Sequence, residues 1–135
     1  MIELVLPYPI STNRYWRTVR GRQIVSAPAR AYKLNAASLA RELGVAEPLS
    51  GPIKVRIALH PVEPKDAQKR ARKEGALWHL SCRSQDLDNI SKVVLDSLNG
   101  ILYVDDRHIV DLHLIRSIPV KGGAAVVRVS RWMPA

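Results

Sequence analysis

Apolar and polar residues alternate with a period of two in four stretches of the chain, and this spacing predicts β-strands with two different faces. Leu4 and Leu6 point the same way in the first stretch, which Pro7 closes. The second stretch is the most regular and ends at Pro61, whereas the alternation of the third is imperfect. The predicted strands are 2–6, 53–59, 108–117 and 125–129.

Glycine-containing turns predict two hairpins. The sequence RGR at 20–22 separates two short strands, which we expect at 15–19 and 23–26. The sequence KGG at 121–123 stands between the last two strands, so these strands are also expected to pair as a hairpin. One more short strand is predicted at 101–104, where all residues are apolar.

Two segments change to helical spacing. The first, 29–43, has Pro28 before its first turn and Gly44 at its end, which are positions that these residue types favour. The second, 86–99, has an apolar stripe on one face and Asp88, Lys92 and Asp96 on the other. The stripe is Leu87, Ile90, Val94, Leu98 and Ile101. The order of strands and helices predicts an α/β fold, a small mixed β-sheet with two helices.

The segment 61–82 differs from the rest because its middle, AQKRARKEGA, is charged and lacks an apolar pattern. This middle part is compatible with a short exposed helix or with a mobile loop. We interpret the segment as a basic insertion that becomes ordered on binding. The 135 residues otherwise fit a single domain, 1–135, without repeats or a linker.

The net charge of +9 predicts a polyanionic partner, with nucleic acid as the first candidate and solvated surface charge as the alternative explanation. No apolar run approaches the roughly 20 residues of a membrane span, and the N-terminus lacks the basic start of a signal peptide. With Cys82 as the single cysteine, we expect a cytoplasmic protein without a membrane partner. The basic residues expected to contact DNA are Arg17, Arg20, Lys69, Arg70, Arg72 and Lys73.

The aspartates, except Asp66, gather in one stretch from Asp86 to Asp111. Asp86 starts the second predicted helix, where it could act only as an N-cap. Capping does not explain Asp88, because two carboxylates so close repel each other unless a cation lies between them. Mg²⁺ favours a few carboxylate oxygens together with water and phosphate. The pair therefore indicates a magnesium site, although this spacing alone is a weak signal.

A third carboxylate is available at 105–106, where Asp105 and Asp106 follow the second helix closely enough to return towards its start. The residues alone leave open which of the two would bind the ion. Lys92 lies one helical turn after Asp88, so it forms an ion pair worth about 0.3–0.5 kcal/mol, stabilises charge on a phosphate, or does both. In a basic chain, this set predicts metal-assisted hydrolysis of a phosphodiester.

Four motifs resemble those of the RusA family of Holliday junction resolvases, most of which are encoded by prophages. The motifs are LPYPISTNRYWR, RSQDLDNISK, LYVDD and PVKGG. Apart from the insertion, the resemblance extends in order from Leu4 to about Val129. It implies a RusA-like fold and an endonuclease of DNA recombination and repair.

The resemblance also implies how such an enzyme works. It implies a homodimer that binds branched DNA, the four-way junction, and makes paired nicks with Mg²⁺ or Mn²⁺. The family's catalytic and metal-binding aspartates correspond to Asp86, Asp88 and Asp106, and its essential lysine corresponds to Lys92.

Two details qualify this resemblance. Asn13 and Arg14 lie in the family's NR motif, which indicates that they contact DNA or support the site. The connection 61–82 is longer than in compact members of the family, so the resemblance does not indicate how this segment contacts DNA. Two other functions stay open: a less selective nuclease of flaps, forks or duplex DNA, and a non-catalytic DNA-binding module whose carboxylates only cap a helix.

Overall fold

A mixed, four-stranded β-sheet forms the centre of the computed structural model, which describes residues 1–134. The strands of the chain are β1 (Ile2–Leu6), β2 (Trp16–Val19), β3 (Arg22–Val25), β4 (Ile53–His60), β5 (Ile109–Arg116) and β6 (Ala124–Arg131). The strand order in the sheet is β1-β6-β4-β5, with β4 and β5 parallel and the other neighbours antiparallel. β2 and β3 form a separate hairpin.

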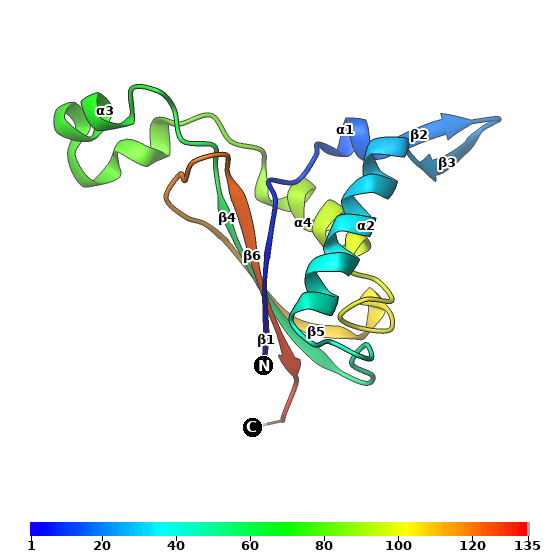
Figure 1. Ribbon diagram of the computed structural model, residues 1–135. Coiled ribbons are helices and arrows are strands. Elements are labelled where there is room, and N and C mark those ends of the chain that lie inside the picture. The colour runs from blue at the N-terminus through cyan, green and yellow to red at the C-terminus, as the bar shows by residue number, and fades with distance from the viewer. Residues whose placement is uncertain (135) are drawn as a thin grey trace.

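Two long helices lie on the same side of this sheet (Figure 1). The helices are α1 (Thr12–Tyr15), α2 (Ala27–Glu42), α3 (Ala67–Glu74) and α4 (Leu87–Ser97), with 3-10 turns η1 (Gly75–Ser81) and η2 (Asp106–His108). α2 starts two residues before its predicted position, because Ser26 Oγ caps it by accepting a hydrogen bond from the Ala29 amide at 3.2 Å. The predicted α/β fold with a mixed sheet is confirmed.

The core lies between the sheet and the helices α2 and α4. On β4 every second residue is buried, as the sequence predicts. α4 contributes Ile90, Val94 and Leu98 to this core, and α2 contributes Ala36 and Ala40. Because its apolar face holds α4 against the sheet, the opposite face of the helix is left for polar side chains.

The predicted hairpin between the last two strands is wrong. β5 pairs with β4 in parallel, whereas β6 lies between β1 and β4. After β5, the amides of Ser117 and Val120 donate to the carbonyls of Leu59 and Pro61 at 2.7 and 3.0 Å, so the chain crosses the end of β4. The glycine turn is present, but residues 117–123 are too long a connection for a tight hairpin loop.

The short strand predicted at 101–104 is also wrong. The segment forms a turn in which the Gly100 amide donates to the Tyr103 carbonyl at 2.8 Å, and Gly100 has a φ of 75°. Leu102 and Tyr103 are fully buried in the core. The apolar run therefore serves packing, and a run of this length does not distinguish a strand from a core-filling turn.

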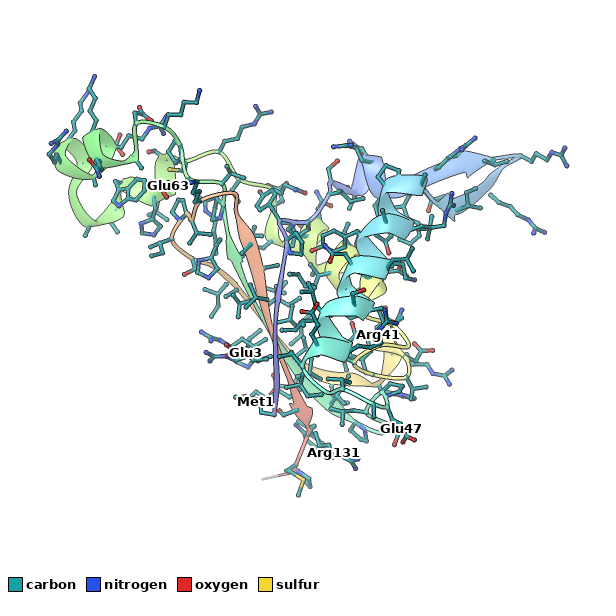
Figure 2. The ribbon with its side chains drawn as sticks, in the orientation of Figure 1. Met1, Glu3, Arg41, Glu47, Glu63 and Arg131 are labelled. Carbon is teal, nitrogen blue, oxygen red and sulfur yellow. The ribbon has the colours of Figure 1, made fainter. Side chains whose placement is uncertain are left out.

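Two arms extend from the central layer on opposite sides, at the upper left and upper right of Figure 1. The hairpin arm, residues 12–25, contains α1, which was not predicted, and the predicted hairpin of β2 and β3. Arg20 and Gly21 have φ angles of 51° and 75°, as a tight two-residue hairpin turn requires. The side chains of both arms extend away from the ribbon (Figure 2).

The basic arm, residues 65–81, contains α3 and η1. It is the middle part of the predicted insertion, and it adopts the helical alternative rather than the loop. Within residues 1–134, no helix combines the length and the apolar character that crossing a membrane requires.

Candidate functional site

The start of α4 presents two carboxylates. Asp86 occupies the N-cap position with an extended backbone, yet its side chain makes no capping hydrogen bond. Asp88 lies in the first turn of the helix. Both are exposed, and within residues 1–134 neither forms an ion pair within 4 Å. The positive end of the helix dipole offsets part of their repulsion, and a bound cation would offset more.

A pocket at this end of α4, which we call the acidic pocket, collects these carboxylates. It is lined by Leu80, Gln85, Asp86, Leu87, Asp88 and Arg116. Gln85 fixes the entry to the helix, because its side-chain Nε2 donates to the Pro9 carbonyl at 2.7 Å and its amide to the Tyr8 hydroxyl at 3.3 Å. The carboxylates thus stand on a segment that is tied to the residues following β1. The sequence analysis did not assign Arg116 to the site.

A second pocket, which we call the lysine pocket, lies further along α4 and beside the hairpin arm. α4 contributes Lys92 and Asp96, and the hairpin arm contributes Trp16 and Gln23. The loop at 105–106, which we call the acidic loop, contributes Asp106. The ion pair expected between Asp88 and Lys92 does not form, since within residues 1–134 Lys92 has no carboxylate within 4 Å. Its exposed ammonium group is therefore available to a ligand.

The two aspartates of the acidic loop at 105–106 differ in their contacts. Asp105 caps the η2 turn by accepting a hydrogen bond from the Arg107 amide at 3.0 Å, and this bond lowers the pKa of its carboxyl group. Asp105 also pairs with the Arg107 side chain at 3.6 Å. Asp106 forms no ion pair in the described chain, and its amide donates to Asn99 Oδ1 at 2.9 Å. This difference favours Asp106 over Asp105 as the residue that meets a ligand.

The residues fit a magnesium ion in donor type, because Asp86 and Asp88 supply hard oxygen ligands from one pocket. Asp106 lines the other pocket. Among residues 1–134, no three His, Cys, Asp or Glu side chains lie close enough together to form a complete metal site. Mg²⁺ needs only one or two carboxylates when water and phosphate complete its shell, so the pair at the helix start satisfies this requirement.

Asp96 has a structural role that the sequence analysis missed. The buried hydroxyl of Tyr15 donates a hydrogen bond to the Asp96 carboxylate, and the Lys33 ammonium lies 3.8 Å from it. Burial, followed by the hydrogen bond to Asp96, raises the pKa of Tyr15. These contacts join the hairpin arm and α2 to α4. The helical spacing from Lys92 was a signal for Asp96, but its partner Tyr15 is far away in sequence.

The residues predicted to contact DNA lie on both arms. Asn13, Arg14, Arg17 and Arg20 are exposed on the hairpin arm. On α3, three of the four predicted basic residues are exposed. These are Lys69, Arg72 and Lys73. The fourth, Arg70, is half-buried and pairs with Asp66 at 2.9 Å, so it is already engaged within the arm.

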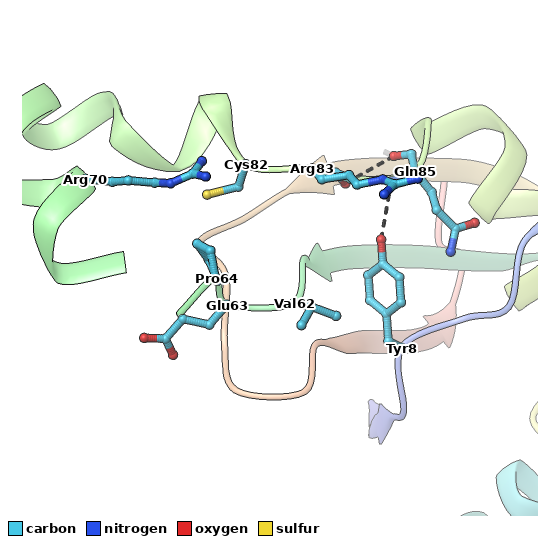
Figure 3. A pocket seen from close by; sticks show the side chains of 9 residues that line it. Tyr8, Val62, Glu63, Pro64, Arg70, Cys82, Arg83 and Gln85 are labelled. Carbon is cyan, nitrogen blue, oxygen red and sulfur yellow. Dashed lines mark hydrogen bonds between the residues drawn. The ribbon is translucent and has the colours of Figure 1, made fainter. Parts of the chain in front are cut away.

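A third pocket lies at the root of the basic arm (Figure 3). Arg70 and Cys82 lie on its arm side, whereas Tyr8 and Val62 lie on its sheet side. The Tyr8 ring points towards Gln85, which also lines the acidic pocket (Figure 3). The base of the basic arm and the start of α4 are thus held by neighbouring contacts.

Comparisons with known proteins agree with these motifs. A profile of the family described as "Endodeoxyribonuclease RusA" matches residues 7–130. The chain is 32% identical over 121 residues to the crossover junction endodeoxyribonuclease RusA of Escherichia coli strain K12, covering 89% of this chain and 86% of that protein. Identity is 31%, with the same coverage, to proteins of that name from Shigella sonnei strain Ss046 and Enterobacteria phage 82. The matched residues include both pockets along α4.

Proposed function

Because the chain belongs to the RusA family of endodeoxyribonucleases, we propose that it is a Holliday junction resolvase that cuts four-way DNA with Mg²⁺, or Mn²⁺ as a substitute. The observation that carries this proposal is the carboxylate pair Asp86 and Asp88, exposed and without ion pairs in the described chain. If Asp86 only capped the helix, its side chain would accept backbone N–H groups, and it accepts none. This argues against a non-catalytic binding module.

Asp86 and Asp88 would hold the metal ion in this proposal, and Asp106, which lies outside their pocket in the described chain, would join them when the ion is bound. When bound, the ion supplies charge stabilisation for the phosphate and lowers the pKa of water. The carboxylates of Asp86 and Asp88 orient this centre, because Gln85 fixes the segment before the helix. The Lys92 ammonium, one helical turn further, stabilises the negative charge that grows on the phosphate during hydrolysis.

The two arms give DNA a basic surface on either side of the site. The chain that leads into α4 runs between the hairpin arm and the basic arm (Figure 1). Exposed arginines and lysines on both arms suit the phosphate backbone, which holds and orients DNA without reading its sequence. The protein would then select a branched substrate because each arm contacts a different duplex of the branch.

The proposed assembly is a homodimer. Paired nicks need two catalytic sites, and each chain carries one pair of carboxylates at the start of α4. A two-fold dimer would present these sites symmetrically to a junction of related symmetry. The proposed place of action is the cytoplasm, where the lone thiol of Cys82 stays reduced.

Cleavage of a synthetic four-way junction tests the proposal. With Mg²⁺ the wild-type protein is expected to nick the junction in pairs, and omission of the metal is expected to stop cleavage. Asp88→Asn should bind the junction and lose cleavage by on the order of 100-fold or more. Glu47→Gln makes the same change of carboxylate to amide far from both arms (Figure 2) and should cut like the wild type.

Unchanged cutting by Asp88→Asn would contradict the assignment of the site. Forked and linear DNA of the same sequence separate a junction resolvase from a less selective nuclease. Equal rates on all three substrates would replace the proposal with the broader activity. If the protein cuts no DNA with Mg²⁺ or Mn²⁺ and neither ion changes its thermal stability, the protein is a binding module.

A further inference from the structure

Arg116 stands at a position where the strand pattern calls for an apolar side chain. In the parallel pairing of β4 and β5, Leu114 lies opposite Ile57, and Arg116 lies opposite Leu59. Ile57 and Leu59 are buried on the helix side of the sheet. Paired residues of neighbouring strands point to the same face, so Arg116 also points to the helix side. A guanidinium group is thus directed towards the start of α4.

The contacts of Arg116 leave most of its hydrogen-bonding capacity unused. Its Nη2 donates to the Leu80 carbonyl at 2.8 Å. Its Nε is buried and has no partner, and within residues 1–134 the guanidinium has no carboxylate within 4 Å. A buried donor without a partner destabilises the folded chain.

Asp86 and Asp88 line the same pocket as Arg116 without pairing with it. If this arginine served only to neutralise the two acids, direct ion pairs would be expected. The arrangement instead leaves room between a fork of donors and two carboxylates. Phosphate is an acceptor that matches the guanidinium fork with two parallel hydrogen bonds.

We propose that Arg116 binds a non-bridging oxygen of the phosphate that is to be cut in the acidic pocket. This inference rests on the proposed function, because it takes that pocket as the place of hydrolysis. The carboxylates would face the metal ion and the guanidinium would face the phosphate. Arg116 therefore joins Lys92 as a cation at the reacting group, from a strand rather than from α4.

The anchor of Arg116 belongs to the basic arm. Leu80 lies in η1, which follows α3 within that arm. The hydrogen bond to the Leu80 carbonyl fixes the orientation of the guanidinium, so the position of the arm and the position of the phosphate-binding group are linked. In this chain the insertion would act on the site as well as on DNA binding.

Three variants test the role of Arg116. Arg116→Gln removes the charge, and Arg116→Lys keeps the charge but removes the fork. Arg41→Gln removes a charge from the last turn of α2, away from both arms (Figure 2). The measurements are junction binding without metal as a function of salt, the rate of cleavage with saturating enzyme and Mg²⁺, and the temperature of unfolding. Together they separate a phosphate contact from a structural anchor.

Arg116→Gln should lower the slope of log Kd against log salt by about 1, as expected for the loss of one phosphate contact. Its cleavage rate should fall by on the order of 100-fold. Arg116→Lys should keep the salt slope and lose about tenfold in rate, because an ammonium does not reproduce the bidentate fork. Arg41→Gln should change neither quantity.

Arg116→Ala supplies a check that is independent of folding defects. Added guanidinium ion should restore part of its cleavage if the missing group acts at the phosphate, whereas a structural loss is not repaired in this way. The proposal is overturned if the salt slope of Arg116→Gln equals that of the wild type, or if cleavage falls only as far as the unfolding temperature explains. If wild type cuts in an Asp88-dependent manner while Arg116→Gln cuts equally well, the inference fails and the proposed function stands. If wild type cuts no DNA, the proposed function itself fails.

Discussion

Asp88 and Asp96 are two aspartates on one polar face of α4, and their surroundings are opposite. Asp88 lies at the helix start, exposed and without an ion pair in the described chain. Asp96 accepts the hydrogen bond of the buried Tyr15 hydroxyl and lies near the Lys33 ammonium. The same side chain is thus left available at one end of the helix and engaged by the fold at the other.

This difference indicates that Asp88 is available to bind a ligand, whereas Asp96 stabilises the fold. A carboxylate that forms hydrogen bonds or ion pairs within the protein stabilises the native state, and a substitution that breaks these contacts lowers the stability. A pair of unpaired carboxylates repels and contributes no such contacts, so its presence calls for a ligand. We therefore expect substitution of Asp88 to lower activity but not stability, and substitution of Asp96 to lower stability.

The largest expected effect concerns the acidic loop. There Asp106 forms no ion pair and Asp105 has partners within the protein, as Asp88 and Asp96 differ on α4. Asp106→Asn should reduce junction cleavage by on the order of 100-fold or more, because the proposed metal loses a carboxylate. Asp105→Asn should cost less than about tenfold, because asparagine also caps a turn and can still accept the Arg107 amide. Single-turnover cleavage with Mg²⁺ measures both variants. A larger loss for Asp105→Asn than for Asp106→Asn would reverse the assignment.

An intermediate effect is expected at the engaged end of α4, where stability rather than chemistry should change. Tyr15→Phe should lower the free energy of unfolding by about 1–3 kcal/mol, because the hydrogen bond to Asp96 is lost. Asp96→Asn should lower it by less, because the amide oxygen still accepts from the Tyr15 hydroxyl but the negative charge near Lys33 is lost. The double variant should lose less than the sum, because both changes act on the same hydrogen bond. Urea unfolding at neutral pH gives these values.

Asp88→Asn is the matched control for that measurement. It should leave the free energy of unfolding unchanged or slightly raised, because it relieves repulsion with Asp86. Strictly additive effects of Tyr15→Phe and Asp96→Asn would show that the two side chains are not coupled. A loss of stability in Asp88→Asn as large as that in Asp96→Asn would remove the distinction between the two ends.

Local patterns were sufficient to predict most elements and the start of the site. Residues 53–59 alternate strictly, and the stripe from Leu87 to Leu98 has helical spacing, so β4 and α4 could be located from a few neighbouring residues. Asp86 and Asp88 are two residues apart in the sequence, and they share a pocket because both stand at the start of one helix. Such features depend on contacts within one element.

Features that depend on pairing between distant residues could not be predicted in the same way. The central place of β6 depends on how the chain crosses the end of β4, and the KGG turn at 121–123 carries no information about that route. The bond between Tyr15 and Asp96 joins residues far apart in the chain. The sequence contained one signal for Arg116. It lies two residues after Leu114, so the alternation of β5 predicts that both side chains point to the same face of the sheet.

The smallest expected effect is a pH dependence that originates at the engaged end of α4. Burial, and then the hydrogen bond to Asp96, raises the pKa of Tyr15 above its ordinary value of 10.0. A raised native pKa means that the contribution to stability is complete below about pH 10 and is lost as the pH rises further. Burial raises the pKa values of Tyr32 and Tyr103 as well, so Tyr15 supplies only part of the total loss.

Tyr15→Phe should therefore reduce the decline of unfolding free energy above pH 10 without abolishing it. Urea unfolding of wild type and variant between neutral pH and pH 11 measures this difference in slope. Asp96→Asn should also reduce the decline, although less, because its hydrogen bond is the second cause of the raised pKa and burial is the first. Asp88→Asn has no part in this network and should follow the wild-type curve. Identical alkaline slopes for wild type and Tyr15→Phe would mean that the Tyr15 hydroxyl is equally easy to ionise in the native and unfolded chains, and would contradict the network proposed at this end of α4.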